Sequence, residues 1–162
     1  MKRIKLTQGK FALVSDIDYT YLNQWKWYAH KDHNTYYAVR CVRDGLKFTT
    51  IQMHKVILIR IGHKYFKGTD HKDRDGLNNQ RRNLRPATHT QNGQNRTIKQ
   101  TNNTSGYRGV NWSKSNVAWQ TRIQFNGRRI HVGYFTNKIE AAKEYNRVAE
   151  KYFGKFARLN TI

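Results

Sequence analysis

A short stretch in the middle of the chain collects side chains that could hold a metal ion and move a proton. It combines one carboxylate, the imidazole next to it and a run of carboxamides. In chain order these are Asp70, His71, Asn78, Asn79, Asn83, Gln91, Asn92 and Asn95. Carboxylate and carboxamide oxygens suit hard divalent cations, and histidine titrates near neutral pH, so it can act as a general base. The pattern predicts metal-assisted attack on a polyanion.

Cleavage of a phosphodiester needs an activated water, neutralisation of charge at the phosphate and help for the leaving oxygen. A magnesium-type ion often takes only one or two protein ligands, and water and phosphate complete its shell. Asp70 supplies one carboxylate, and the Asn92 carboxamide oxygen would supply a second ligand. Neighbouring side chains of an extended segment point to different sides, so Asp70 and His71 could divide the metal and base roles. Taken alone, His71 would be an ordinary surface histidine.

The charge of the chain points to a polyanionic partner. Its 162 residues carry 31 Lys and Arg against 10 Asp and Glu, a formal charge of +21. Self-repulsion of this size opposes a compact fold, so we expect the basic surface to serve nucleic acid, with an anionic membrane surface as the rival partner. Residues 1–95 carry 18 basic and 7 acidic side chains, and residues 96–162 carry 13 and 3, so both halves share the excess.

Several classes of protein are disfavoured by composition. Cys41 is the only cysteine, which excludes an internal disulfide and a Cys-rich zinc site. No apolar run is long enough to span a bilayer, and the first residues lack the apolar stretch of a signal peptide. We therefore expect an intracellular protein that is not secreted. The 21 Trp, Tyr and Phe residues are enough for a core, unlike a disordered basic tail.

The first half of the chain predicts a small α+β region. Strands are expected over 10–14, 36–42 and 47–51, and a short helix over 53–61. Turns are expected at Asp16–Asp18 and at Asp44–Gly45, and the Asp/Asn/Gly-rich segment 68–80 is expected to be a loop. The aromatic segment 22–28 is left without an assignment.

The second half predicts three strands covered by one helix. Residues 97–106 have no periodicity and read as a linker, which separates a domain over 1–96 from one over 107–162. Residues 119–125 and 129–134 alternate between apolar and polar, and Asn126-Gly127 between them is a strong hairpin signal. A third strand is expected over 107–112. Asn137 starts a helical pattern that ends at Gly154. The polar sheet face stays exposed and basic.

Residues 54–95 resemble an HNH nuclease of the homing-endonuclease kind. The match runs through Met53-His54-Lys55, Asp70-His71, Leu77-Asn78-Asn79, Arg82-Asn83-Leu84-Arg85, Thr88 and Gln91-Asn92. The resemblance implies two short antiparallel strands and a helix around one ion, a ββα-metal module with its core at about 53–96. It assigns His71 as base, Asp70 and Asn92 as metal ligands, and Asn83 as the hydrogen-bonding residue that positions His71. Pro86 is expected to end the second strand.

The implied cofactor is a divalent metal, Mg²⁺ with Mn²⁺ as an alternative, and no zinc or small-molecule cofactor is expected. Asn92 stands where many HNH nucleases have a histidine, a change that the homing subgroup shares. The implied partner is double-stranded DNA, and the chain is expected to be a monomer or weak dimer. A monomer would nick one strand, whereas a dimer could cut both. The sequence leaves open which occurs.

Residues 105–160 resemble the Apetala/ethylene-response-factor DNA-binding domain. The match includes Ser105-Gly106-Tyr107-Arg108-Gly109-Val110, Trp119-Gln120-Thr121-Arg122-Ile123, His131-Val132-Gly133-Tyr134-Phe135, Glu140-Ala141-Ala142 and Tyr145-Asn146. The polar sheet face offers Arg122, Gln124, Arg129 and His131 to base edges. The resemblance adds Arg108 and, more weakly, Asn111 and Ser113. Lys99, Lys114 and Arg128 are expected to contact phosphates.

The two resemblances in tandem predict a mobile-element endonuclease, of phage or other microbial origin, with a sheet-type DNA reader. Two other classes stay open. One is a non-cleaving, sequence-specific regulator with a degenerate nuclease module. The other is a packaging protein that coats nucleic acid through charge alone. Asn111, Ser113 and Gln124 replace arginines of the plant domains, so the plant target sequence does not transfer.

Overall fold

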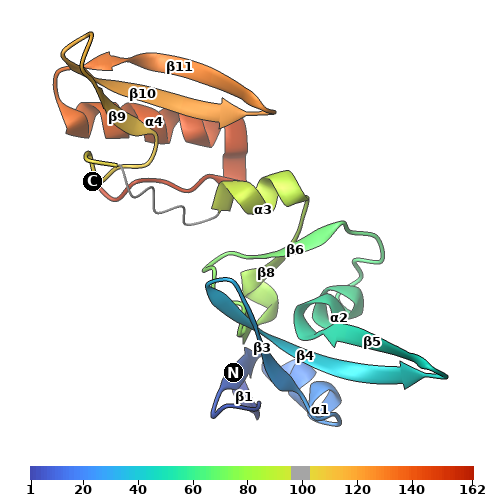
Figure 1. The fold of residues 1–162 in the computed structure, drawn as a ribbon. Helices are drawn as coiled ribbons and strands as arrows, with labels where there is room; N and C mark the ends of the chain where they lie inside the picture. Colours follow the sequence, from blue (N-terminus) through green and yellow to red (C-terminus); the bar gives the residue numbers. More distant parts are fainter. Residues whose placement is uncertain (96–102) are drawn as a thin grey trace. The chain divides into compact units, whose positions relative to one another are not determined.

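The computed structural model describes residues 1–95 and 103–162 (Figure 1). The chain forms two compact units, Met1–His89 and Thr90–Ile162, each with its own apolar core. Most of the predicted linker, 97–106, lies outside the described residues, as does Lys99. Among the described residues no helix is long and apolar enough to cross a membrane. The predicted α+β class is confirmed.

Unit 1 contains three small sheets and two helices that belong wholly to it. Its sheets are β1-β2-β7, β3-β4-β5 and the pair β6-β8. The strands are β1 (Lys2–Lys5), β2 (Phe11–Val14), β3 (Tyr28–Asp32), β4 (Thr35–Asp44), β5 (Lys47–Gln52), β6 (Gly68–His71), β7 (Asn78–Asn79) and β8 (Leu84–Ala87). The helices are α1 (Asp16–Leu22) and α2 (Met53–Arg60), with a 3₁₀ turn η1 (Arg81–Asn83) before β8. Helix α3 (His89–Asn95) begins at the last residue of unit 1.

The core of unit 1 draws on almost every element up to β8. Its largest fully buried side chains include Leu22 at the end of α1 and Met53, Ile57 and Leu58 on α2. The partners that complete the cluster are Ile4, Leu6, Ala12, Val14, Trp27, Ala29, Ala38 and Leu84. Leu84 joins this core from β8, so the strand that follows Asn83 is fixed by apolar packing.

The predicted strands over 10–14, 36–42 and 47–51 and the helix over 53–61 are confirmed as β2, β4, β5 and α2. The turn predicted at Asp16–Asp18 is wrong, because these residues open α1. Both carboxylates lie in its first turn, where the partial positive charge of a helix N-terminus favours them. The open segment 22–28 contains the end of α1, a turn and the first residue of β3.

The loop predicted over 68–80 is wrong in part, because its ends form β6 and β7. β6 pairs with β8 from Gly68↔Ala87 to His71↔Leu84, and β7 pairs in parallel with β2. Pro86 does not end its strand as predicted, since β8 continues to Ala87. A two-stranded sheet has only edge strands, and an edge strand tolerates a proline that lacks an N–H donor. Pairing with strands far away in the sequence therefore decides the structure of this segment, although its polar composition predicted a loop.

Asp18 ties helix α1 to two distant parts of unit 1. Its carboxylate is fully buried and accepts hydrogen bonds from Arg81 at 2.7 Å and from Arg60 at 3.2 Å. Burial opposes ionisation, but the hydrogen bonds and charges of the two arginines outweigh it and lower the pKa of Asp18. Because Arg81 begins the 3₁₀ turn η1 that ends at Asn83, the ion pair also anchors the segment that leads to the candidate site.

We expect Asp18→Asn to lower the free energy of unfolding by about 3–5 kcal/mol, the usual cost of removing one partner of a buried ion pair. Urea denaturation of the full chain measures the change. Asp16→Asn on the same helix is the matched control, because the Asp16 side chain is 66% exposed and its ion pair is with the exposed N-terminal amino group. Equal stability of the two variants would contradict an anchoring role for Asp18.

The same ion pair predicts an acid dependence of stability. A carboxyl whose pKa is lowered by folding stabilises the native state above its unfolded pKa, ordinarily 3.8. That contribution falls as the pH drops through 3.8 and towards the lower pKa of the folded protein. The wild-type chain should therefore lose more stability in acid than Asp18→Asn, which has no proton to gain at this position.

Unit 2 is a three-stranded antiparallel sheet with one helix packed on it. The sheet order is β11-β10-β9, with β9 (Val110–Ser113), β10 (Ala118–Phe125) and β11 (Arg128–Phe135). Helix α4 (Lys138–Phe153) follows, and a 3₁₀ turn η2 (Gly154–Phe156) comes after it. The predicted hairpin, with its two strands, and the helix are confirmed. Asn126 and Gly127 both have positive φ, as a type I′ turn requires.

The Asn137 side chain caps α4 by accepting a hydrogen bond from the Ile139 N–H at 2.7 Å, and Gly154 ends the helix. The helix covers the apolar sheet face through two clusters of buried residues. Their members are Ile123, Tyr145, Val148, Ala149 and Phe153 in one, and Val110, Ala141 and Ala142 in the other. The polar residues of β10 and β11 are left on the opposite face.

The strand predicted over 107–112 is shifted by three residues, because β9 begins at Val110. Gly109 has φ +74°, which breaks the extended backbone just before the strand. A Cβ at Gly109 would overlap the ring of Tyr145, so close packing against α4 requires glycine here. Arg108 therefore lies in the segment before β9, where its N–H donates to the Asn160 side chain at 2.7 Å.

Candidate functional site

Asp70 and His71 are the last two residues of β6, in the two-stranded sheet with β8. In the register of this sheet Asp70 lies opposite Arg85 and His71 lies opposite Leu84. Adjacent residues of a strand point to opposite faces. The structure therefore gives the carboxylate and the imidazole separate surroundings. Asp70 is 5% exposed and His71 is 6% exposed, so both are buried.

Asn83 holds the turn that follows β6. Its side-chain amide donates to Asp73 Oδ1 and to the Asn78 carbonyl, both at 2.8 Å, and its own Oδ1 accepts from the Asp73 N–H at 3.1 Å. Its carbonyl also accepts the Lys72 N–H at 2.9 Å. These bonds fix the path of the chain directly after His71. Any effect of Asn83 on chemistry must therefore pass through the placement of its neighbours.

The Asp70 carboxylate forms an ion pair with Arg85. The guanidinium reaches Oδ2 through Nη2 at 2.5 Å and through Nε at 2.7 Å. The pair is nearly buried, with side-chain exposures of 12% for Arg85 and 6% for Asp70. A charge-assisted double contact of this kind is strong. A cation that binds Asp70 must therefore share the carboxylate with Arg85 or displace the guanidinium.

His71 lies in a cluster of three rings. The Tyr37 ring centroid is 5.9 Å from that of His71, and the His54 centroid is 5.2 Å from it in an edge-on arrangement. Tyr37 comes from β4 and His54 from α2, so the imidazole is held by side chains far away in the sequence. Gly76 allows this packing, because a Cβ there would overlap the Tyr37 ring.

Burial keeps both histidines of the cluster neutral. It lowers the pKa of His71 below 6.5, and hydrogen bonding to Asn79 and the nearby carboxylates oppose this only in part. Burial, together with the charges of His71 and Lys55, lowers the pKa of His54 to about 3. A neutral imidazole at pH 7 has a free lone pair on one nitrogen. His71 is thus in the protonation state that a general base needs.

The predicted first-half site residues do not all fall in one unit. Asp70, His71 and Asn83 lie together at the β6–β8 pair of unit 1. Asn92, the predicted second metal ligand, lies on α3 within unit 2, as do Gln91 and Asn95. The described residues contain no group of three or more His, Cys, Asp or Glu side chains arranged to hold a metal ion. Of the two predicted metal ligands, Asp70 alone lies in unit 1.

Sequence reasoning missed two features of this site. Arg85 was matched only as part of the Asn83-Leu84-Arg85 motif, although its place on β8 puts it across from Asp70. A correct pairing of β6 with β8 would have exposed this contact. The sequence indicates His54 only as part of the Met53-His54-Lys55 match. It is buried in α2, and it also lies against His71, with no hydrogen-bond partner for Nδ1 among the described residues. No local pattern signals this proximity.

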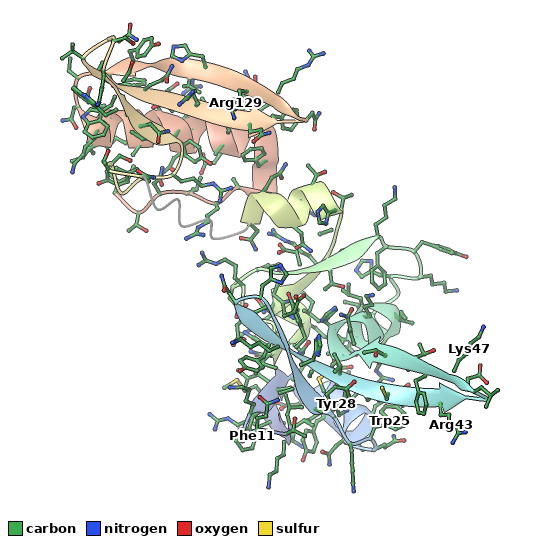
Figure 2. All side chains as sticks on the ribbon, viewed as in Figure 1. Phe11, Trp25, Tyr28, Arg43, Lys47 and Arg129 are labelled. Atoms are coloured by element: carbon green, nitrogen blue, oxygen red, sulfur yellow. The ribbon has the colours of Figure 1, made fainter. Side chains whose placement is uncertain are left out.

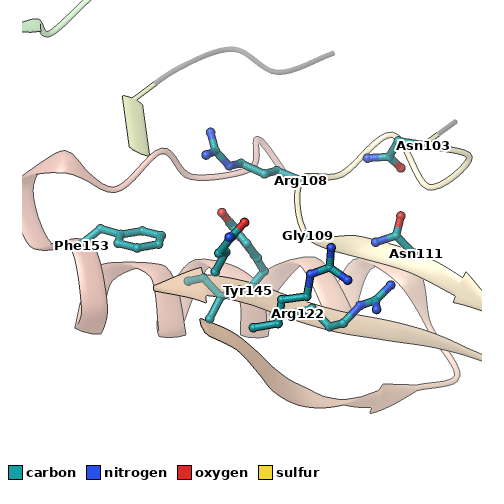
Figure 3. A pocket seen from close by; sticks show the side chains of 10 residues that line it. Asn103, Arg108, Gly109, Asn111, Arg122, Tyr145 and Phe153 are labelled. Carbon is teal, nitrogen blue, oxygen red and sulfur yellow. The ribbon is translucent and has the colours of Figure 1, made fainter. Parts of the chain in front are cut away.

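The predicted DNA-contact residues gather on unit 2. Register places Arg122 opposite His131 and Gln124 opposite Arg129, so these four share the exposed sheet face. Five of the six predicted residues line one cavity of about 360 Å³ (Figure 3): Arg108, Asn111, Arg122, Gln124 and Arg129. His131 is not part of its lining; its ring packs on Tyr134 at 4.6 Å, and its Nδ1 lies 3.2 Å from the Gln120 amide.

Arg108 differs from the other predicted contacts in its surroundings. Burial raises the pKa of the Tyr145 hydroxyl, and the adjacent Arg108 guanidinium opposes that rise through its charge and a hydrogen bond. Arg108 thus reaches the cavity from the side of helix α4, while Arg122 and Arg129 belong to the sheet. Three guanidinium groups around one cavity make it a favourable place for an anion.

Comparison with known proteins relates the chain to a viral protein. No family model matches the chain. The chain is 30% identical, over 158 residues, to a protein of Acanthamoeba polyphaga mimivirus that is named an uncharacterized HNH endonuclease. The match covers 96% of this chain and 77% of the viral protein. It spans both units and therefore includes the β6–β8 pair with Asp70, His71 and Asn83.

Proposed function

The chain belongs to the HNH endonuclease family, and we propose that it is a metal-dependent endonuclease that hydrolyses phosphodiester bonds in double-stranded DNA. One observation carries the proposal: a buried, neutral imidazole follows a carboxylate directly at the end of β6, and Asn83 fixes the turn behind them. Carboxylate and base are thereby adjacent in the chain but face different sides of one strand.

His71 is assigned as the general base. Its neutral form accepts a proton from water at one ring nitrogen, and Asn79 and the Tyr37 and His54 rings hold the imidazole in place. Asn83 is assigned as a positioning residue, because its hydrogen bonds run to the turn at Asp73 and Asn78. General-base catalysis contributes about 100- to 10,000-fold to a rate, so His71 should carry a large part of the activity.

Asp70 is assigned as the metal ligand in unit 1. A single carboxylate with water and phosphate oxygens is a normal set for Mg²⁺ or Mn²⁺, whereas zinc sites use three or four nitrogen and sulfur ligands. The absence of a His/Cys cluster from the described residues fits the first class. Such an ion, when bound, neutralises charge on the scissile phosphate. Asn92 as second ligand rests on the family resemblance.

Arg85 and burial set the conditions for activity. Asp70 is held by the Arg85 guanidinium, and the exposures of 5% and 6% leave little of Asp70 and His71 open to a substrate. Catalysis therefore requires that side chains around the β6–β8 pair move when DNA arrives. A DNA phosphate is a suitable alternative partner for the Arg85 guanidinium, so the same step can release Asp70.

DNA recognition is assigned to the exposed sheet face of unit 2. Arg122, Gln124 and Arg129 present the side chains that pair with guanine and adenine edges, and all three are exposed. Arg108 and Asn111 join them in lining the 360 Å³ cavity. His131 completes the set through its cross-strand position beside Arg122.

One observation favours a second candidate, a DNA-binding regulator that does not cut. The buried Asp70–Arg85 ion pair satisfies the carboxylate without any metal, as a purely structural pair would. The +21 charge and the basic sheet face suit such a regulator equally well. The two candidates differ only in what happens to the DNA after binding, so a cleavage assay separates them.

A plasmid-nicking assay tests the proposal. With Mg²⁺ the full chain should convert supercoiled plasmid to nicked circles, because the ion neutralises the phosphate that His71-activated water attacks. A chelator should stop the reaction, and excess Mg²⁺ should restore it. Agarose gels resolve the topological forms. If the protein binds the plasmid but leaves it supercoiled in both Mg²⁺ and Mn²⁺, the result would favour the regulator.

A further inference from the structure

The outer half of the β4–β5 hairpin is regular strand that lies outside the core of unit 1. Residues 41–50, called here the ribbon, pair in register from Cys41↔Thr50 to Asp44↔Lys47. Nine of these ten residues are exposed, and Val42 is half-buried. Figure 2 shows Arg43 and Lys47 near the end of this hairpin. A two-stranded hairpin without core contacts is marginally stable in water, so a covering partner would add to its stability.

The tip of the ribbon is apolar and well defined. Leu46 is 92% exposed and Phe48 is 71% exposed. Gly45 has φ +58° and opens a two-residue turn, and Arg43 Nε donates to the Gly45 carbonyl at 2.9 Å. The Arg43 guanidinium also lies 5.8 Å from the Phe48 ring directly across the ribbon. Two large apolar side chains that are exposed at an ordered turn indicate a contact surface.

The charges around the ribbon select the partner. Arg43 and Lys47 lie on it, Arg40 lies at its base stacked on Trp25 at 4.3 Å, and Asp44 is its one acid. A second copy pairing along the edge of β5 would bring two chains of formal charge +21 together, which self-repulsion opposes. A polyanion faces no such cost. The observations therefore favour nucleic acid over a second copy of this chain.

We propose that the ribbon is a separate DNA-binding surface that lies in the major groove of the duplex. This rests on the proposed function, in that DNA is the substrate. A major groove about 12 Å wide admits a two-stranded β-ribbon. Arg43 and Lys47 contact phosphates at its walls, and Leu46 and Phe48 face base edges, where thymine methyl groups offer apolar contacts. The ribbon thus adds contacts from unit 1 to those of unit 2.

Salt-dependent binding tests the charged contacts. The full chain is titrated against a fluorescein-labelled mixed-sequence duplex in chelator, so that no cleavage occurs, at several salt concentrations. Arg43→Gln with Lys47→Gln should lower the slope of log affinity against log salt by about 2, one for each lost phosphate contact. Lys26→Gln with Lys64→Gln is the matched control, since both lysines are exposed in unit 1 and neither belongs to residues 41–50. An equal drop in the control pair would overturn the proposal.

Leu46→Ser tests the apolar contact. It should weaken binding about tenfold, as expected for an apolar side chain that DNA no longer buries, and leave the salt slope unchanged. Methylation at guanine N7 blocks the major groove. At some guanines it should interfere with binding of the wild-type chain but not with binding of Leu46→Ser. Thermal unfolding should be unaltered, because Leu46 lies outside the core.

The outcomes separate this proposal from the nuclease assignment. A wild-type chain that binds but never nicks would refute the nuclease and leave the ribbon standing if its variants weaken binding as stated. Ribbon variants that bind and footprint like the wild type would refute the ribbon even if nicking is normal. Variants that change sedimentation of the free protein but not DNA affinity would assign the ribbon to self-association and overturn the proposal.

Discussion

His71→Ala is expected to lower the rate of DNA nicking by about 100- to 10,000-fold, the usual cost of losing a general base, while DNA affinity stays close to that of the wild type. The imidazole is buried and neutral, and the other imidazole of the ring cluster, His54, is a poor replacement because burial lowers its pKa to about 3. The phosphate-binding charge of the chain lies elsewhere and is unchanged. Single-turnover nicking at saturating protein measures the chemical step, and fluorescence anisotropy in chelator measures binding.

Two controls make this result specific. His63→Ala changes an exposed histidine of the same unit and should nick like the wild type. Because His71 packs against Tyr37 and His54, its removal also leaves a space, so free imidazole should partly restore nicking to His71→Ala if the base is what is missing. Full activity without imidazole would refute the assignment of His71. Failure of rescue together with lost thermal stability would make His71 a structural residue.

Unit 2 shows what local patterns can predict. Its strands alternate between apolar and polar residues, its hairpin turns at Asn126-Gly127, and its helix begins at Asn137. Each feature is encoded within a few neighbouring residues, and each agrees with the others, so the local preferences and the final fold coincide. The prediction failed only at the start of β9. There Gly109 packs closely against the ring of Tyr145, which lies 36 residues further along the chain.

Unit 1 shows where such patterns stop being informative. β6 and β7 are short, polar strands that exist because β8 and β2 pair with them. Asp18 lies in the first turn of helix α1, and its carboxylate, which the sequence suggested as part of a turn, is bound by Arg60 and Arg81. These contacts join segments more than forty residues apart. No window of neighbouring residues contains both partners.

The candidate site also combines local and long-range features. Asp70 and His71 could be proposed from their types and adjacency, and the resemblance to HNH nucleases adds Asn83 as a positioning residue. Their surroundings could not be, because Tyr37 and His54 approach His71 from β4 and α2. The Asp70–Arg85 pair likewise depends on the register of β6 with β8. The sequence thus predicts which groups are present, and the fold determines their protonation and access.

DNA affinity is expected to fall by about 10³- to 10⁵-fold between about 50 and 200 mM salt, as for a protein that neutralises about 6–10 phosphates. The chain carries +21, with a charge excess in both halves. With only 10 acidic side chains against 31 Lys and Arg, internal ion pairs can neutralise no more than a minority of its cations. Each Lys or Arg side chain that a phosphate then neutralises releases counterions from the DNA.

Anisotropy titrations in chelator over a series of salt concentrations give the slope. The contribution of unit 2 can be isolated with Arg122→Gln and Arg129→Gln, which should each remove about one unit if the side chain contacts phosphate. A base-reading role would instead lower the affinity for a preferred site more than that for mixed-sequence competitor. A nearly flat salt slope for the wild-type chain would exclude duplex DNA as its main partner, because a surface this basic cannot bind a polyanion without displacing its counterions.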